Sequence, residues 1–216
     1  MDAAFWHQKW QNNEIGFHRD KVNPFLVDYV DRLLLKPGDR LFLPLCGKSL
    51  DVGWLLSKGY DVVGVELHEP AVKALFDDLA VKPEITLCHQ LKSYHYDRIC
   101  IFVGDLFDLT AEDLGHIDAV YDRAAIVALP ETVRVRYAQH IIMLSDAAPQ
   151  LLINYEYEQS VMNGPPFSVS NDELKIHYNS HYDMTLLEHC DVEGGLKGRC
   201  PATENVWLLQ RNLKTL

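Results

Sequence analysis

The stretch that decides the fold spans residues 41–66 and reads LFLPLCGKSLDVGWLLSKGYDVVGVE. An apolar run is followed by a break around Gly47, then by an amphipathic segment and a second apolar run. This pattern predicts a strand over residues 40–45, a helix over 49–58 and a strand over 62–65. Two strands joined through a helix indicate a right-handed crossover and a parallel pair.

The Gly47-Lys48-Ser49 triplet invites comparison with a nucleotide phosphate loop. That motif needs another glycine at position 42, where this chain has Phe42, and Pro44 removes a further backbone donor. The glycine fingerprint of nicotinamide-binding sheets is absent as well. The turn is therefore predicted to admit a ligand close to the backbone without gripping a phosphate.

The same alternation continues on both sides of this stretch. We expect helices over 24–35, 69–80, 130–144 and 171–178, and strands over 117–121, 150–157, 184–192 and 203–211. Residues 84–103 predict a hairpin or two strands. The fold class is α/β, a doubly wound and mostly parallel sheet with an antiparallel strand near one edge. We expect one domain over 1–216, with an N-terminal helical lid (1–38) and a sheet core (39–216).

Composition restricts the kind of partner. The chain has 216 residues, 48% of them hydrophobic, and a formal net charge of −11. Such a charge argues against nucleic acid and membrane surfaces as partners, because both attract clustered Lys and Arg, and it favours a small molecule. No apolar run reaches the roughly 18 residues of a membrane span, and the N-terminus lacks the layout of a signal peptide.

Cysteines and histidines give little sign of metal binding. The five cysteines are widely spread and form no Cys-x-x-Cys pair, which favours a reduced, cytoplasmic protein. His177 and His181 have metal-ligand spacing, but no third ligand is placed nearby, so no metal site is predicted.

Several side chains follow predicted strands at the edge where ligands bind to such sheets. Glu66 ends the second strand and is placed to accept hydrogen bonds from the hydroxyls of a ribose. The alternative is that Glu66 is a solvated acid at a strand end with no ligand. Asp105 follows another strand and can hydrogen-bond an adenine amino group while Leu106 and Phe107 flank the ring, or this segment simply forms a turn. Asp122 and Arg123 end a third strand, where they form either a functional pair facing the ligand or only a local ion pair.

Together these residues resemble one known family, the bacterial branch of the thiopurine S-methyltransferases. The resemblance covers nearly the whole chain. It rests on residues 42–66 and on FWHQKWQNNEIGFH (5–18), YDRAAIVALP (121–130), NGPPF (163–167) and ENVWLL (204–209).

The resemblance implies a class I methyltransferase that uses S-adenosylmethionine and methylates the sulfur of aromatic or heterocyclic thiols, with selenium or tellurium compounds as further acceptors. It assigns cofactor contacts to Trp10, Leu45, Glu66, Asp105, Leu106 and Arg123. It assigns the acceptor side to Trp6, Phe17, Phe167 and Arg199, the last on the loosely matching stretch GLKGRC.

Chemistry suggests roles for some of these residues. The methyl donor is already activated, so the protein mainly has to align two reactants. Arg123, with Asp122 beside it, is the predicted catalytic group, because Arg123 and Arg199 favour an ionised acceptor sulfur. Trp6 and Trp10 either close over the site or anchor an amphipathic helix on the core.

Two other functions compete with this one. A module that binds S-adenosylmethionine without catalysis, acting as a sensor, would share the binding residues but turn over no thiol. An oxidoreductase on the same sheet would bind nicotinamide, and the missing glycine fingerprint counts against it. We expect a monomer, because one core accounts for the apolar faces.

Overall fold

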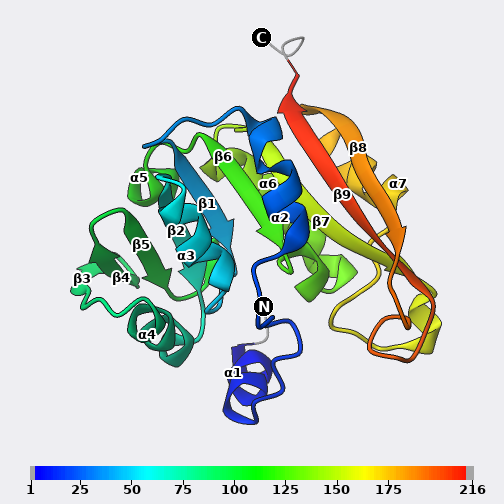
Figure 1. The fold of residues 1–216 in the computed structure, drawn as a ribbon, viewed down its shortest axis with the longest axis horizontal. Helices are drawn as coiled ribbons and strands as arrows, with labels where there is room; N and C mark the ends of the chain where they lie inside the picture. Colours follow the sequence, from blue (N-terminus) through cyan, green and yellow to red (C-terminus); the bar gives the residue numbers. More distant parts are fainter. Residues whose placement is uncertain (1–2, 213–216) are drawn as a thin grey trace.

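Nine strands form one sheet within residues 3–212, the part of the chain that the computed structural model describes. Their order is β3-β4-β5-β2-β1-β6-β7-β9-β8 (Figure 1). The five central strands, from β5 to β7, run parallel. The predicted α/β class with a mostly parallel sheet is therefore confirmed. The strands are β1 (Arg40–Pro44), β2 (Asp61–Glu66), β3 (Glu84–Cys88), β4 (Leu91–Tyr96), β5 (Ile99–Val103), β6 (Ala119–Arg123), β7 (Gln150–Tyr157), β8 (Tyr182–Asp191) and β9 (Ala202–Arg211).

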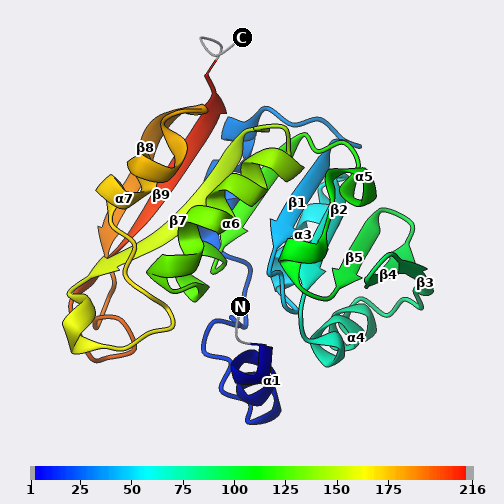
Figure 2. The ribbon, with the colours of Figure 1, turned by 180° about the vertical axis from the view of Figure 1, so that it is seen from behind.

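The central strands are apolar because helices cover both of their faces. In β1 and β2 every residue after the first is buried. One core cluster contains Leu26 of α2, Val52 of α3 and Val72 of α4, and the other contains residues of α5, α6 and α7. Figure 2 shows α6 and α7 on the face opposite α2. The helices are α1 (Ala3–Gln11), α2 (Pro24–Tyr29), α3 (Leu50–Ser57), α4 (Glu69–Asp78), α5 (Ala111–Leu114), α6 (Glu131–Leu144) and α7 (Asn171–Tyr178).

Both edges of the sheet are antiparallel, whereas the sequence indicated only one such edge. The predicted antiparallel pairing of the last two strands is confirmed by β8 and β9, and β9 also runs antiparallel to β7. At the other edge, residues 84–103 form three strands, because positive φ angles at His89 and Asp97 allow two tight turns. The prediction of a hairpin or two strands there was one strand short.

The N-terminal residues divide into two parts. α2 lies on the sheet, with its N-terminus capped by the Asn23 side chain. The predicted helix over 24–35 becomes a short 3-10 helix after Tyr29, and it ends at Leu34 in the left-handed conformation. α1 instead lies beyond the carboxyl ends of the parallel strands (Figure 1). The proposed division into a lid (1–38) and a core (39–216) stays a prediction, and residues 1–2 and 213–216 lie outside the described residues.

Candidate active site

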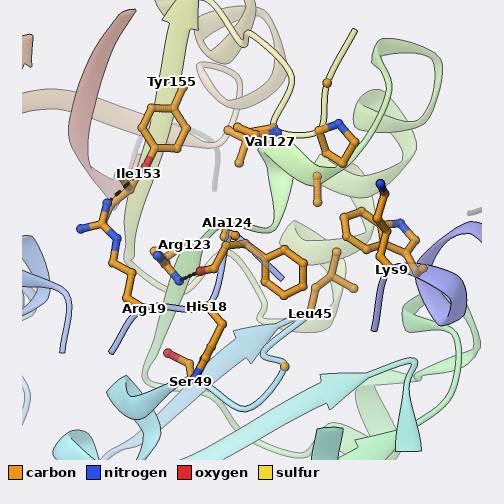
Figure 3. Close-up of a pocket in the computed structure, with 18 of the residues that line it drawn as sticks. Lys9, His18, Arg19, Leu45, Ser49, Arg123, Ala124, Val127, Ile153 and Tyr155 are labelled. Carbon is orange, nitrogen blue, oxygen red and sulfur yellow. Dashed lines mark hydrogen bonds between the residues drawn. The ribbon is translucent and has the colours of Figure 1, made fainter. Parts of the chain in front are cut away.

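A cavity of about 860 Å³ opens where the parallel strands end, between the sheet and the N-terminal segment. Because β9 runs antiparallel to β7, its first residues lie at the same rim and add to the wall. Figure 3 shows side chains from the N-terminal segment, β6 and β7 around one space. Among the residues predicted from sequence, the cavity is lined by Trp6, Trp10, Phe17, Leu45, Glu66, Arg123 and Arg199.

Glu66 is held at the end of β2 by backbone donors. Its Oε2 accepts a hydrogen bond from the Gly47 N–H at 2.9 Å, and its Oε1 accepts one from the His68 N–H at 2.7 Å. Burial raises the pKa of this carboxyl from its ordinary value to about 7, and the backbone donors oppose that rise. A ligand that donates to Glu66 therefore favours its ionised form.

The turn after β1 brings the backbone close to an aromatic ring. Leu45 and Gly47 both have positive φ, 50° and 55°, which turns the chain sharply before α3. A Cβ at Gly47 would lie 3.2 Å from the Trp10 ring, so only glycine leaves this approach free. Trp10 also stacks on His68, with centroids 5.6 Å apart. α1 thus rests on the turn through Trp10.

Arg123 and Asp122 point to different places. The Arg123 Nη1 donates to the Phe17 carbonyl at 2.8 Å, which ties the N-terminal segment to β6 across the cavity. Asp122 is fully buried and does not line the cavity. Its carboxylate accepts from the Tyr137 hydroxyl at 2.7 Å and from the Ile126 N–H at 3.1 Å. These contacts support a role for Asp122 in holding the loop after β6, and its catalytic role stays a prediction.

Three further predicted residues are not part of the cavity lining. Asp105 caps a short 3-10 helix by accepting from the Phe107 N–H, and Leu106 is fully buried in the core. The ring of Phe167 lies against Gly164, and the backbone N–H of Phe167 donates to the Val127 carbonyl. None of these three side chains lines the cavity, so their ligand contacts stay predictions.

Positive charge gathers at the cavity although the chain is acidic. Basic side chains from four regions line it: Lys9, Arg19, Lys48, Arg123, Lys197 and Arg199. Desolvation, with Lys48 and Arg123 nearby, lowers the pKa of His18. Lys197 donates to the Pro165 carbonyl at 2.8 Å, and desolvation lowers its pKa as well. Four acidic side chains also line the cavity, namely Glu14, Asp51, Glu66 and Glu204, so the excess of positive charge is modest and favours an anionic group only beside the basic side chains.

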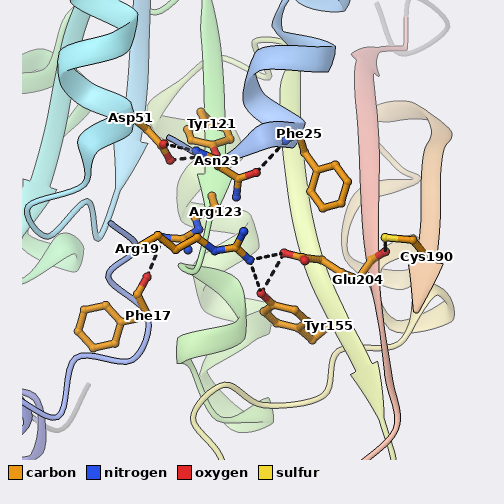
Figure 4. A network of polar contacts seen from close by, with 10 residues as sticks. All are labelled: Phe17, Arg19, Asn23, Phe25, Asp51, Tyr121, Arg123, Tyr155, Cys190 and Glu204. Atoms are coloured by element: carbon orange, nitrogen blue, oxygen red, sulfur yellow. Dashed lines mark hydrogen bonds and ion pairs between the residues drawn. The ribbon is translucent and has the colours of Figure 1, made fainter. Parts of the chain in front are cut away.

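A polar network that sequence reasoning missed completes the wall (Figure 4). Tyr155 of β7 and Glu204 of β9 are paired directly across the two strands, and the Tyr155 hydroxyl donates to the Glu204 Oε1 at 2.9 Å. The Arg19 Nη2 donates to both, at 3.2 Å and 3.3 Å. The network joins residues up to 185 positions apart, so no local pattern reveals it.

One group of possible metal ligands lies away from this cavity. The ligand atoms of Cys88, His89 and Asp113 all lie within 4.8 Å of one another. Both Cys88 and His89 are hydrogen-bonded to the same Asp113 oxygen, which accounts for their closeness. Within residues 3–212, no helix has the length and apolar character that crossing a membrane requires.

Comparison with known proteins places the chain beside one group of enzymes. Residues 1–212 match the model of the thiopurine S-methyltransferase family. A thiopurine S-methyltransferase of Teredinibacter turnerae is 50% identical, with 100% of both chains covered. One from Xanthobacter autotrophicus is 48% identical, with 98% of this chain and 100% of the relative covered.

Solved structures agree on the fold. A Burkholderia thailandensis 1,6-didemethyltoxoflavin-N1-methyltransferase with bound S-adenosylhomocysteine has a TM-score of 0.64 at 13% identity, covering 97% of this chain and 87% of that one. A TehB-like SAM-dependent methyltransferase of Corynebacterium glutamicum has a TM-score of 0.58 at 15% identity, covering 97% and 98%. At these identities the likeness concerns the fold alone.

Proposed function

Because the chain belongs to the thiopurine S-methyltransferase family and is an S-adenosylmethionine-dependent S-methyltransferase, we propose that its cavity holds the cofactor and a thiol acceptor side by side. The acceptor is an aromatic or heterocyclic thiol such as a thiopurine, and selenium or tellurium compounds extend the range. The observation that carries this proposal is Glu66, a buried carboxylate whose backbone partners present it to the cavity.

The residues around Glu66 fit the cofactor. Ribose hydroxyls donate hydrogen bonds, and a carboxylate at this strand end accepts them. The glycine at position 47 leaves room where any side chain would meet Trp10. A volume of about 860 Å³ accommodates two small molecules, since ligand cavities commonly span roughly 300–1,000 Å³.

The opposite side of the cavity suits an acceptor. In the sheet, β6 and β7 separate β9 from β1 and β2, so Glu204 and Arg199 lie far from Glu66 in strand order. Arg123 stands between the two sides, at the end of β6. Its charge, with that of Arg199, favours the thiolate over the thiol, and the thiolate is the better nucleophile.

When bound, S-adenosylmethionine supplies a methyl group already activated by a sulfonium. The protein therefore has to hold the acceptor in line and exclude water, and alignment supplies up to about 7–11 kcal/mol in the best intramolecular cases. The rings of Trp6 and Trp10 each meet Phe17 edge to face, with centroids 5.9 Å and 5.3 Å apart. We propose that these three rings cover the reacting atoms.

Calorimetry with S-adenosylmethionine, followed by 6-mercaptopurine in the same sample, tests the proposal. Micromolar cofactor binding and formation of S-adenosylhomocysteine are expected. Glu66→Gln should weaken cofactor binding, whereas Glu84→Gln, on an exposed residue of β3, serves as the matched control. Cofactor binding without turnover of any thiol would favour the sensor alternative, and equal binding by both variants would remove Glu66 from the site.

We further propose a cytoplasmic monomer that acts in detoxification on small molecules rather than on nucleic acid. All five cysteines are free, which supports a reducing compartment. The apolar faces of the central strands are covered by helices of the same chain, which supports the monomer. Light scattering during size-exclusion chromatography distinguishes one chain from two.

A further inference from the structure

The two carboxylate oxygens of Glu204 have different surroundings. Oε1 accepts hydrogen bonds from the Tyr155 hydroxyl and from Arg19. Oε2 makes no hydrogen bond with any residue in the described range 3–212. Only 8% of the Glu204 surface is exposed, and the residue lines the cavity. Since Oε2 is not among the fully buried atoms without a partner, it is an acceptor that water or a ligand can reach from the cavity.

A ligand that covers this oxygen also removes water from it. That ligand then has to replace the lost hydrogen bond, because a covered acceptor without a partner is unfavourable. A carboxylate oxygen can only accept, so the group that fills this position has to be a donor, an N–H or O–H. Arg19 offsets the charge of the carboxylate but bonds only to Oε1. A ligand that covers Oε2 is therefore favoured when it donates a hydrogen bond to this oxygen.

The position of Glu204 indicates which ligand does so. β9 is separated from β2, which carries Glu66, by β1, β6 and β7. A ribose bound at Glu66 occupies the opposite side of the cavity. The donor that reaches Glu204 therefore belongs to the acceptor.

Many heterocyclic thiols carry such a donor. Where a ring nitrogen adjoins the carbon that bears sulfur, the compound exists in water as a thione, with the proton on nitrogen. Methylating that sulfur requires the N–H proton to leave. A plain aryl thiol has no ring N–H and loses its proton from sulfur instead.

We propose that Glu204 recognises the ring N–H of a heteroaromatic thione and accepts its proton as the sulfur is methylated. This inference rests on the proposed function and specifies the acceptor class and a catalytic base. The acceptor sulfur forms a bond to the methyl carbon while the bond from that carbon to the sulfonium breaks, with its electron pair staying on the cofactor sulfur. The electron pair of the N–H bond becomes the second bond of the ring C=N, and the π pair of the C=S bond forms the new bond from sulfur to the methyl carbon. The proton passes to the Glu204 Oε2.

Several titratable groups surround Glu204. Arg19 comes from the N-terminal segment, Tyr155 from β7, and Cys190 of β8 donates from Sγ to the Glu204 backbone carbonyl. Burial raises the pKa of Tyr155 to about 12, with Glu204 as the next cause, so its hydroxyl stays a donor at neutral pH. Burial also raises the pKa of Cys190. Neither group competes with Glu204 as the proton acceptor.

The test compares two acceptors in Glu204→Gln. The acceptor 2-mercaptopyridine is a thione with one ring N–H beside the sulfur, and 4-nitrothiophenol ionises without any. Turnover of 2-mercaptopyridine at neutral pH should fall by about 100-fold or more, the usual range for a general base. Turnover of 4-nitrothiophenol should change far less. In the variant, the 2-mercaptopyridine rate should rise about tenfold per pH unit, as solvent takes over the proton.

A binding measurement and a second variant separate recognition from folding. With S-adenosylhomocysteine present, calorimetry should show weaker binding of 2-mercaptopyridine to Glu204→Gln and little change for 4-nitrothiophenol. Tyr155→Phe removes a partner of Oε1 and leaves Oε2 as an acceptor, so it should keep turnover of 2-mercaptopyridine relative to 4-nitrothiophenol far better than Glu204→Gln does. Thermal unfolding of each variant reports whether the fold persists.

The remaining outcomes overturn the inference in different ways. An equal loss for both acceptors in Glu204→Gln, or no loss for either, would refute a role for Glu204 in N–H recognition. A wild-type protein that methylates 4-nitrothiophenol but not 2-mercaptopyridine would refute the acceptor class assigned to Glu204. A wild-type protein that methylates neither would refute the proposed thiol acceptor itself, independently of any variant.

Discussion

Glu66→Gln replaces an acceptor oxygen by an NH₂ group on the side of the cavity proposed for the cofactor. In the native protein both carboxylate oxygens face backbone N–H groups, at 2.9 Å and 2.7 Å. The glutamine turns a donor toward one of these donors and removes the negative charge. Losing charge-assisted hydrogen bonds costs about 1.5–3 kcal/mol, so the dissociation constant for S-adenosylmethionine should rise about 10- to 150-fold at pH 8.

The pH dependence of binding makes this prediction sharper. Without ligand, the Glu66 pKa is about 7 because of burial. Hydroxyl donors prefer the ionised form, so cofactor affinity should increase as pH rises through 7. The ionised fraction grows from about 0.1 at pH 6 to about 0.9 at pH 8, and wild-type affinity should therefore increase about tenfold. The variant lacks this titration, and its affinity should stay level by comparison.

The stability of the ligand-free protein should fall as pH rises, which is opposite to the change in cofactor affinity. Since the folded pKa of Glu66, about 7, exceeds the ordinary 4.5, the folded protein binds this proton more tightly than the unfolded chain does. The Glu66 contribution to stability is therefore present below pH 4.5 and lost as pH rises to 7, by about 3 kcal/mol in total. Urea unfolding of the ligand-free protein at pH 5 and pH 8 measures this loss in wild type and in Glu66→Gln. The difference between the two proteins in the pH-dependent change of unfolding free energy gives the contribution of Glu66.

Calorimetry at pH 6, 7 and 8 measures the binding part on the same two proteins, with Glu84→Gln as the control. Parallel affinity profiles for wild type and Glu66→Gln would show that another group titrates. An unchanged dissociation constant at pH 8 would refute the ribose contact itself.

Three further substitutions test other parts of the site. Arg123→Ala should lower cofactor affinity and turnover at least about tenfold, because a charged donor at the end of β6 is lost. Calorimetry measures the affinity and initial rates measure the turnover. Gly47→Ala should destabilise the fold by about 1–2 kcal/mol, measured by urea unfolding, because alanine is strained in the left-handed conformation of this turn. It should also weaken cofactor binding, measured by calorimetry, because the new methyl group meets the Trp10 ring. Asp122→Ala should cost about 2–4 kcal/mol of stability by urea unfolding, because the buried Tyr137 hydroxyl and a backbone N–H lose their acceptor.

Matched controls separate these effects from general disturbance. Arg98→Ala removes an exposed arginine away from the cavity and should leave binding and turnover unchanged. Wild-type affinity and turnover in Arg123→Ala would exclude that residue from the mechanism. For Asp122→Ala, normal stability with lost turnover would reverse the argument and support the predicted catalytic role.

Local patterns were enough for much of the fold. Buried runs and the break at Gly47 indicated β1, α3 and β2, because hydrophobic periodicity and turn chemistry act over a few residues. The third strand within residues 84–103 was missed because it depends on left-handed turns at His89 and Asp97, two residue types that also occur in loops. The predicted helix over 24–35 was too long, because Leu34 adopts a left-handed conformation that its residue type does not indicate.

Local pattern alone indicated only the Glu66 side of the site, whereas Arg199 on the other side of the cavity was indicated by the family resemblance. Glu66 stood out because an acid at the end of a strand, after a tight turn, is a short-range signal. Arg19, Tyr155 and Glu204 gave none, since the strand pairing and the path of the N-terminal segment bring them together. Asp105 follows a strand just as Glu66 does, yet its side chain is used to cap a 3-10 helix.

The antiparallel direction of β9 has a consequence for how such enzymes diversify. The strand carries Glu204 to the rim from the last fifteen residues of the chain, whereas the residues around Glu66 come from the first third. Under the proposed assignment of the two sides, mutation near Glu204 can change acceptor preference while the residues around Glu66 stay as they are. For engineering, the same proposal favours a library confined to the loop 192–199 and the start of β9, which leaves Glu66 and its neighbours unchanged.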